Sequence, residues 1–343
     1  MATTAKPAVM DGLSPPPPGD AYFDRDTGAW ILSRYADVLA AFRDARLYPV
    51  GPRGEDQGDT RDKNGVLHLR HEVQDALSTD KVAEWQRAME SLVDRSLDSV
   101  NVDQSHDLLE AFAKPWCMSL ALTVTDADVA DRPLLSDLGR QVFAGTGELP
   151  ESPLKASAAA ATDELKRYFE SSSHPMAEAT FIGISQTLPR LLVNGWLALF
   201  RVPTEASRLR DEPHLMPCAV EELLRYAGII PALYRKARED VRIGTVRIAA
   251  GDRVHLMIAS ANRDPEKYPD PDRLDVSRRA TGQLALGIGR SSCAGARVIR
   301  MANGVALGAI LRTFSAVDIV NSTLWRTGSG FCWPASVHVA LRR

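Results

Sequence analysis

The spacing of apolar and polar residues predicts helices over most of the chain. Residues 69–99 are charged and broadly amphipathic, a pattern typical of a helix with one buried face. The same reasoning predicts a helix over HLMPCAVEELLRYAG and further helices near residues 105–123, 132–144, 154–171 and 294–313. The chain is therefore expected to be dominated by helices.

The longest apolar run extends from Ala179 to Phe200, and its periodicity does not separate a helix from a strand. Its length favours a buried helix, because strands are usually much shorter. Pro189 removes one backbone hydrogen bond within this run. We therefore expect a long buried helix that is distorted near Pro189.

Strands are predicted in only a few short segments. GAWILSRYADVLAAFRDARLY predicts a strand followed by a helix, and DVRIGTVRIAAGDRVHLMIASANRD alternates around Gly-containing turns, as in a hairpin. The tail WPASVHVALRR is also β-like, whereas residues 50–66 form a polar loop and PEKYPDPDRLDVSRR has too many prolines for either element. We expect an α+β fold, mainly α with a small β region, as a single domain over 21–343 after a Pro-rich arm over 1–20.

Charge and cysteine usage exclude several classes of protein. The net charge is −3 and the Lys and Arg residues are scattered, which gives no reason to expect a nucleic-acid partner. No apolar stretch has the length of a signal peptide or of a membrane span. The four cysteines lie far apart without a CxxC pair, so neither a disulfide framework nor a zinc site is indicated. These features predict a cytoplasmic protein that binds no membrane.

One cysteine lies in a loop rich in glycine, LALGIGRSSCAGARVIR. Gly287 and Gly289 permit backbone angles closed to other residues and let a flat partner approach. Cys293 falls at the predicted start of the last helix, where free amides and the helix dipole favour a thiolate that can bind a soft metal. The alternative is a small core residue, as most lone cysteines are, and the loop alone leaves both interpretations open.

Motifs elsewhere in the chain agree with the ligand interpretation. They are Glu222-Leu-Leu-Arg225, Arg273 in YPDPDRLD, and the loop Gly287-x-Gly289-x-x-x-Cys293-x-Gly295. Glu-x-x-Arg alone is equally explained by an exposed ion pair. Together, these motifs resemble those of the cytochrome P450 family of haem-thiolate enzymes, in particular its bacterial monooxygenases, from about residue 20 to the C-terminus.

The resemblance implies a cofactor and its ligands. The cofactor is haem b (iron protoporphyrin IX), with Cys293 as the proximal ligand of the iron. Arg235 and Arg70 match basic contacts to the haem propionates. Glu222, Arg225 and Arg273 match a structural network behind the cysteine loop, within the triangular fold of the family. The other haem contacts implied are Gly183, Leu286, Gly287, Gly289, Arg290 and Gly295.

The distal side departs from the family pattern. The usual Ala/Gly-Gly-x-Asp/Glu-Thr motif corresponds to residues 183–187, which read Gly-Ile-Ser-Gln-Thr. Thr187 and Gln186 are the catalytic candidates, although Gln186 replaces an acid and cannot relay a proton by ionising. Ile184 replaces a glycine that leaves room beside oxygen. These changes either alter the chemistry or merely tune the shape of the pocket.

The cysteine loop and the chain length depart as well. Leu286 stands where the family usually has Phe, and Ser291 where it has His or Arg. Arg290 is adjacent and either replaces that propionate contact or faces a redox partner. The linker ESSSHPMAE is too short for the helix usual at that point, so we expect a more open roof over the site.

We therefore expect an oxidoreductase of the monooxygenase type that acts on a small organic, biosynthetic substrate. Peroxide-dependent turnover, oxidative coupling or rearrangement would accommodate the missing acid. No GxGxxG fingerprint follows a strand, so electrons would come from a ferredoxin and its reductase. The alternative is a haem-binding scaffold or recruitment protein with little or no such activity. The predicted substrate pocket includes Ile184, Ile230, Leu233 and Phe331.

Overall fold

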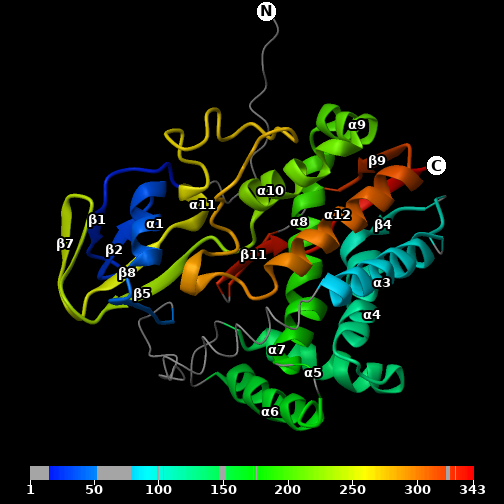
Figure 1. Ribbon diagram of the computed structural model, residues 1–343, viewed down its shortest axis with the longest axis horizontal. Helices are drawn as coiled ribbons and strands as arrows, with labels where there is room; N and C mark the ends of the chain where they lie inside the picture. Colours follow the sequence, from blue (N-terminus) through cyan, green and yellow to red (C-terminus); the bar gives the residue numbers. More distant parts are fainter. Residues whose placement is uncertain are drawn as a thin grey trace, which may run out of the picture.

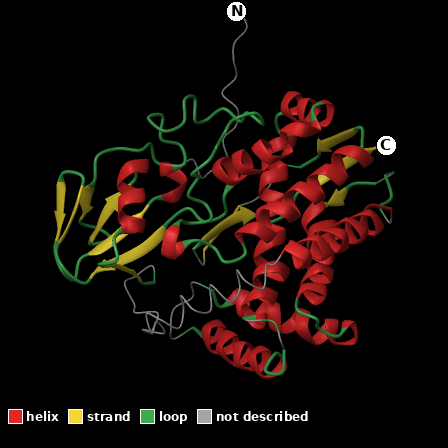
Figure 2. Cartoon of the chain, viewed as in Figure 1, coloured by secondary structure: helices red, strands yellow, loops and turns green. Residues whose placement is uncertain are grey.

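The computed structural model describes residues 15–51, 79–98, 100–102, 104–146, 152–172, 174, 176–321, 325–328 and 330–343. A helical region and a smaller β-rich region lie side by side (Figures 1 and 2). The mainly helical α+β class predicted from the sequence is confirmed. Most of the predicted N-terminal arm lies outside the described residues.

Most of the longer helices follow the predicted ranges, whereas α9 was not predicted and α11 lies in the segment predicted as a hairpin. They are α1 (Tyr35–Arg43), α3 (Thr79–Asp98), α4 (Lys114–Val124), α5 (Arg132–Ala144), α6 (Pro153–Tyr168), α7 (Ala177–Ile182), α8 (Leu188–Phe200), α9 (Pro203–Asp211), α10 (Met216–Ala227), α11 (Ile258–Ala261) and α12 (Ala296–Thr313). π-Helical turns at Leu108–Ala113 and Gly183–Thr187 precede α4 and α8. The predicted helix over 132–144 coincides with α5, and the part of 69–99 before Thr79 lies outside the described residues.

The largest sheet has the strand order β1-β2-β8-β5-β3, in which only β2 and β8 run parallel. The predicted hairpin is confirmed for β6 and β7, whereas β8 joins the larger sheet, where Val254 and Leu256 are fully buried. The strands are β1 (Tyr22–Asp24), β2 (Ala29–Leu32), β3 (Leu47–Pro49), β4 (His106–Asp107), β5 (Leu233–Ala237), β6 (Val241–Ile243), β7 (Val246–Ile248), β8 (Arg253–Leu256), β9 (Ala316–Ile319), β10 (Trp325–Gly328), β11 (Phe331–Pro334) and β12 (His338–Arg342).

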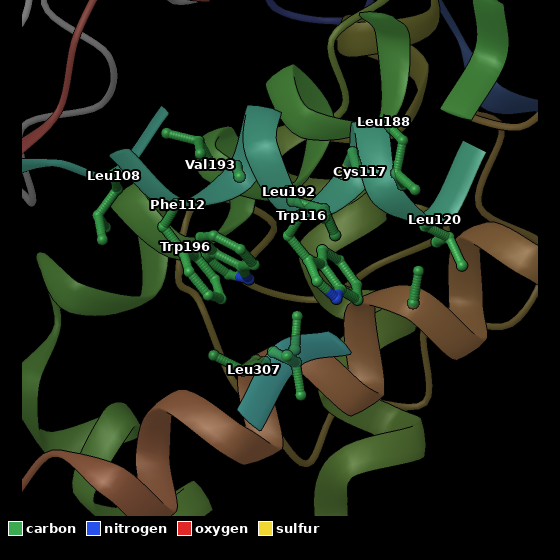
Figure 3. Close-up of a cluster of buried hydrophobic side chains, with 14 of the residues drawn as sticks. Leu108, Phe112, Trp116, Cys117, Leu120, Leu188, Leu192, Val193, Trp196 and Leu307 are labelled. Carbon is green, nitrogen blue, oxygen red and sulfur yellow. The ribbon is translucent and has the colours of Figure 1, made fainter. Parts of the chain in front are cut away.

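The main hydrophobic core lies among α3, α4, α8 and α12. Trp116 and Trp196 are completely buried in it (Figure 3). The ring of Phe112 contacts both, with centroid separations of 6.4 Å to Trp116 and 5.7 Å to Trp196. Large aromatic side chains contribute much of the apolar area buried in a core, so this cluster holds α8 firmly in place.

The distortion predicted near Pro189 is a π-helical turn. The Leu188 N–H donates to the carbonyl of Gly183, five residues earlier, and Pro189 follows without an N–H of its own. Nearly every residue of α8 is buried, which explains why the run from Ala179 shows no clear periodicity. None of the described helices, α8 included, is long and apolar enough to cross a membrane.

The Pro-rich segment after α11 contains no helix or strand between residues 262 and 288. Glu222 and Arg225 of α10 hold it, and both are inaccessible to solvent. Arg225 donates two hydrogen bonds to the Glu222 carboxylate, at 2.7 and 2.8 Å. It donates two more to the backbone carbonyls of Asn262 and Pro271, at 2.8 and 2.9 Å. Helix α10 therefore anchors this irregular segment.

The third charged residue of this cluster is Arg278, and the prediction of Arg273 is wrong. Nε of Arg278 lies 3.0 Å from Oε1 of Glu222. The Arg273 side chain is exposed, and its backbone carbonyl accepts a hydrogen bond from Arg278. Arg278 rather than Arg273 reaches Glu222 because of the path of the chain. The Asp275 N–H donates to the Glu222 carboxylate, at 3.1 Å, and so brings the residues after Asp275 close to it.

Replacing Arg278 by Ala is expected to lower the free energy of unfolding by about 3 kcal/mol, because the buried Glu222 carboxylate then lacks one of its cations. Arg273→Ala is the matched control and should change this free energy by less than about 0.5 kcal/mol. Urea denaturation followed by circular dichroism measures both values. Equal losses in the two variants would contradict the assignment of Arg278.

Candidate functional site

A cavity of about 280 Å³ lies between the helical unit α7–α8 and the beginning of α12. Thr180, Gly183 and Thr187 line one side, at the spacing of three to four residues that marks one helix face. Cys293 and the residues after it line the other side. The cavity thus joins the two segments that the sequence indicated, although more than a hundred residues separate them in the chain.

The cysteine loop is shaped by its backbone. The Cys293 N–H donates to the carbonyl of Leu286, at 2.7 Å, which closes the loop on itself. Gly287 has a φ of +64°, and a Cβ at this position would lie 2.2 Å from the carbonyl oxygen of Ser291. Only glycine therefore fits at 287. Gly289 also has a positive φ, but the space around it is open.

The thiol of Cys293 differs from the two buried thiols. Cys117 and Cys332 are packed in the interior, and burial raises the pKa of Cys332 to about 11. Burial raises the pKa of Cys117 well above its usual value too, so both remain neutral packing residues. Cys293 is instead exposed and lines the cavity, which favours the ligand interpretation over the core interpretation.

The distal motif places its side chains on two faces. Thr187, Gly183 and Ile184 line the cavity. The Gln186 side chain is buried against α5, so close to Gly139 that a Cβ there would lie 2.9 Å from Nε2. The structure therefore does not bring Gln186 to the cavity, because it lies on a different face of the helix from Thr187. Among the described lining residues there is no Asp or Glu.

Arg235 reaches the cysteine loop from strand β5. It is 4% exposed, and Nη2 donates to Oγ of Ser291 at 3.0 Å. Nη1 donates to the carbonyl of Tyr234 at 2.9 Å. A buried guanidinium thus lies beside the loop, and its predicted contact to a haem propionate stays a prediction. Arg70 and the side chain of Arg290 lie outside what the structure describes.

Three of the four predicted substrate contacts do not line this cavity. Ile184 does, but Ile230 and Phe331 pack in a separate apolar cluster that includes Leu286. The Phe331 ring also stacks on Phe143 of α5, with centroids 5.7 Å apart. Leu233 packs against the core of the large sheet. Residues from distant segments form these clusters, and no local sequence pattern predicts such contacts.

Trp85 and His174 are lining residues that the sequence analysis did not single out. Their rings stack with centroids 6.0 Å apart and an interplanar angle of 28°. Met176, also in the lining, precedes α7 with a φ of +56°. Trp85 belongs to the apolar face of a predicted helix, and this pattern indicates only a buried core residue. His174 belongs to the short linker. The stacked pair therefore forms part of the cavity wall.

Known proteins match most of this chain. A family model described as Cytochrome P450 matches residues 206–327. The vitamin D(3) 25-hydroxylase of Pseudonocardia autotrophica is 30% identical over 325 residues, which cover 82% of this chain and 80% of that protein. The nocardicin C N-oxygenase of Nocardia uniformis subsp. tsuyamanensis is 29% identical over 344 residues, covering 88% of this chain and 86% of that one.

The fold is similar to solved structures of cytochrome P450 proteins. The LnmA cytochrome P450 hydroxylase from the leinamycin biosynthetic pathway of Streptomyces atroolivaceus superimposes with a TM-score of 0.78 at 25% sequence identity. The match covers 91% of this chain and 90% of that chain. The sequence and structural comparisons therefore agree over nearly the whole length.

Gly287→Ala is expected to disrupt the cysteine loop, because the added Cβ collides with a backbone oxygen that cannot move alone. Gly289→Ala is the control and should cost about 1–2 kcal/mol of unfolding free energy, since it adds only the strain of a positive φ. The loss of unfolding free energy in Gly287→Ala should be at least twice as large. This variant should also change the rate at which a thiol reagent modifies Cys293. Similar losses and labelling rates in both variants would show that the close contact does not shape the loop.

Proposed function

The chain belongs to the cytochrome P450 family, and we propose that it is a haem-dependent oxidoreductase of the monooxygenase type that oxidises a small, largely apolar organic molecule. The observation that carries this proposal is that Cys293 and Thr187 line one cavity from opposite sides. A thiol and a hydroxyl that line the same, mostly apolar cavity suit a flat cofactor bound there.

The residues present fit haem, and we propose haem b as its form. Cys293 is exposed to the cavity and is the thiolate ligand available to iron there. A Cβ at Gly183 would meet no atom within 4 Å, so space is open on the distal side. Most of the described lining is apolar, and Arg235 offers a buried cation for a carboxylate. When bound, haem supplies an iron whose thiolate ligand favours cleavage of an O–O bond.

Thr187 is the group that we assign to proton handling. Its hydroxyl both donates and accepts, so it can orient water and pass a proton into the cavity. No described lining residue is Asp or Glu, and Gln186 lies against α5. Solvent or the substrate would then supply the proton, or peroxide the oxygen. Oxidative coupling or rearrangement would also lessen the need for an acid.

The names of the relatives support the class of reaction. One is a 25-hydroxylase of vitamin D(3) and another an N-oxygenase of nocardicin C, so both oxidise organic molecules. We propose the same class of substrate here, with electrons from a ferredoxin and its reductase. The apolar lining of the cavity suits such molecules.

The reduced protein should give the carbon monoxide difference spectrum of a haem-thiolate. Cys293→Ala should abolish it because the axial sulfur is lost. Cys218→Ala, a partly exposed cysteine on α10, is the control and should leave it unchanged. A screen for spin-state shifts with organic compounds, followed by mass spectrometry, then identifies substrates. An intact spectrum without product from any electron source or peroxide would favour the scaffold alternative.

Thr187→Ala is expected to lower the product formed per electron pair by about 10- to 100-fold, because the cavity loses its hydroxyl for proton transfer. Thr187→Ser should retain most of the product yield. Thr180→Ala is the control within the same lining and should stay near the wild-type value. Product and released peroxide are measured together. If Thr187→Ala formed as much product per electron pair as the control, Thr187 would have no role in the mechanism.

A further inference from the structure

The cavity is elongated along one helical unit. Its lining residues run from Met176, just before α7, to Leu191 in α8. The residues at both junctions of the π-helical turn keep right-handed helical torsion angles, so α7, the turn and α8 form one continuous helix. At 1.5 Å per residue, the start of α7 at Ala177 lies about 15 Å from Thr187 along this helix. The cavity therefore extends from Thr187 to the linker before α7.

His174 belongs to the wall at the linker end of this cavity. Among the described lining residues, only His174 and Cys293 have side chains that can carry a charge, and most of the others are apolar. An imidazole has two ring nitrogens, so it can keep a protein partner through one nitrogen and bind a ligand through the other. A polar group on a bound molecule therefore has a hydrogen-bonding partner at this end of an apolar space.

The imidazole is held in a fixed orientation. It stacks on the indole of Trp85, which is itself 5% exposed in α3. The His174 N–H donates to Oγ of Ser172 at 3.1 Å, and the Ser172 N–H donates to the carbonyl of Phe169 at 3.0 Å. Stacking occupies a face of the ring, whereas the hydrogen bonds of an imidazole lie in the ring plane. The stack thus orients His174 without using its nitrogens.

We propose that His174 is a specificity-determining residue that hydrogen-bonds to a polar group of the substrate. The substrate is then an elongated, mostly apolar molecule, with a hydroxyl or carboxylate about 10–15 Å from the atom that is oxidised near Thr187. Trp85 is a positioning residue, which acts by holding the imidazole. This inference rests on the proposed function, since oxidation in this cavity requires haem at Cys293. A preorganised polar group in an apolar pocket discriminates strongly against analogues that cannot bind it.

The test compares three probes by isothermal titration calorimetry with the haem-loaded protein. Decanoic acid and 1-decanol carry the polar group, and 1-chlorodecane has the same chain without a hydroxyl or carboxylate. His174→Ala should bind the acid, the alcohol or both about 3- to 10-fold more weakly, because one hydrogen bond is lost. Its affinity for 1-chlorodecane should stay within about twofold of the wild type. The two polar probes distinguish an anionic from a neutral group on the substrate.

Two further variants control for the loss of the ring. His174→Gln keeps a donor and an acceptor and should retain most of the affinity for the polar probes. His214→Ala removes an exposed histidine outside the described cavity lining and should change none of the three affinities. Equal weakening for all three probes in His174→Ala would show that the side chain only fills space, and would overturn the proposal. Unchanged affinities, or a wild type that binds neither polar probe, would overturn it too.

A double-mutant cycle tests the role of Trp85. Trp85→Leu should weaken binding of the same polar probes, and adding it to His174→Ala should weaken them no further, because Trp85 acts through the imidazole. Trp85→Phe keeps an aromatic ring and should behave like the wild type. Multiplying effects would remove Trp85 from the proposal. A wild type without a haem-thiolate spectrum would overturn the proposed function and this inference together, whereas an intact spectrum without selective weakening in His174→Ala would overturn this inference alone.

Discussion

The carboxylate of Glu222 must be fully compensated, because it is completely removed from solvent. Arg225 and Arg278 supply its cations, and the Asp275 N–H adds a further hydrogen bond. Arg225 also binds the carbonyl of Asn262, whose side-chain oxygen accepts from the Leu284 N–H at 2.8 Å. A continuous set of hydrogen bonds therefore runs from α10 to the start of the cysteine loop.

This arrangement explains how a segment without regular structure can position the loop that carries the exposed Cys293 thiol. From residue 262 to 288 the chain has no helix or strand whose ladder would satisfy its backbone groups. Carbonyls along it instead accept from Arg225 and Arg278. Arginine suits this task, since one planar guanidinium donates to several oxygens at once. The position of Cys293 thus depends on charged residues that do not touch the cavity.

The opposite wall of the cavity has a different support. Helix α8 is buried on nearly all sides, and Trp196 joins it to the aromatic core with Trp116 (Figure 3). Thr187 lines the cavity while Gln186 packs against α5, because consecutive residues of a helix lie on different faces. A rigid helix and a pinned loop together set the space between Thr187 and Cys293. Such preorganised walls favour binding of a flat, rigid cofactor.

Local patterns determined much of this protein. The spacing of residues within one segment predicts three features: helix α5, the distortion at Pro189 and the pair Glu222–Arg225. Within one segment, backbone geometry alone decides which residues meet. The ion pair of Glu222 with Arg278 rather than Arg273 did not follow from such spacing. An irregular segment has no regular period that predicts which of its side chains points toward Glu222. The stacking of Phe331 on Phe143 joins residues far apart in the chain. Such contacts depend on how whole elements pack, which only the tertiary structure decided.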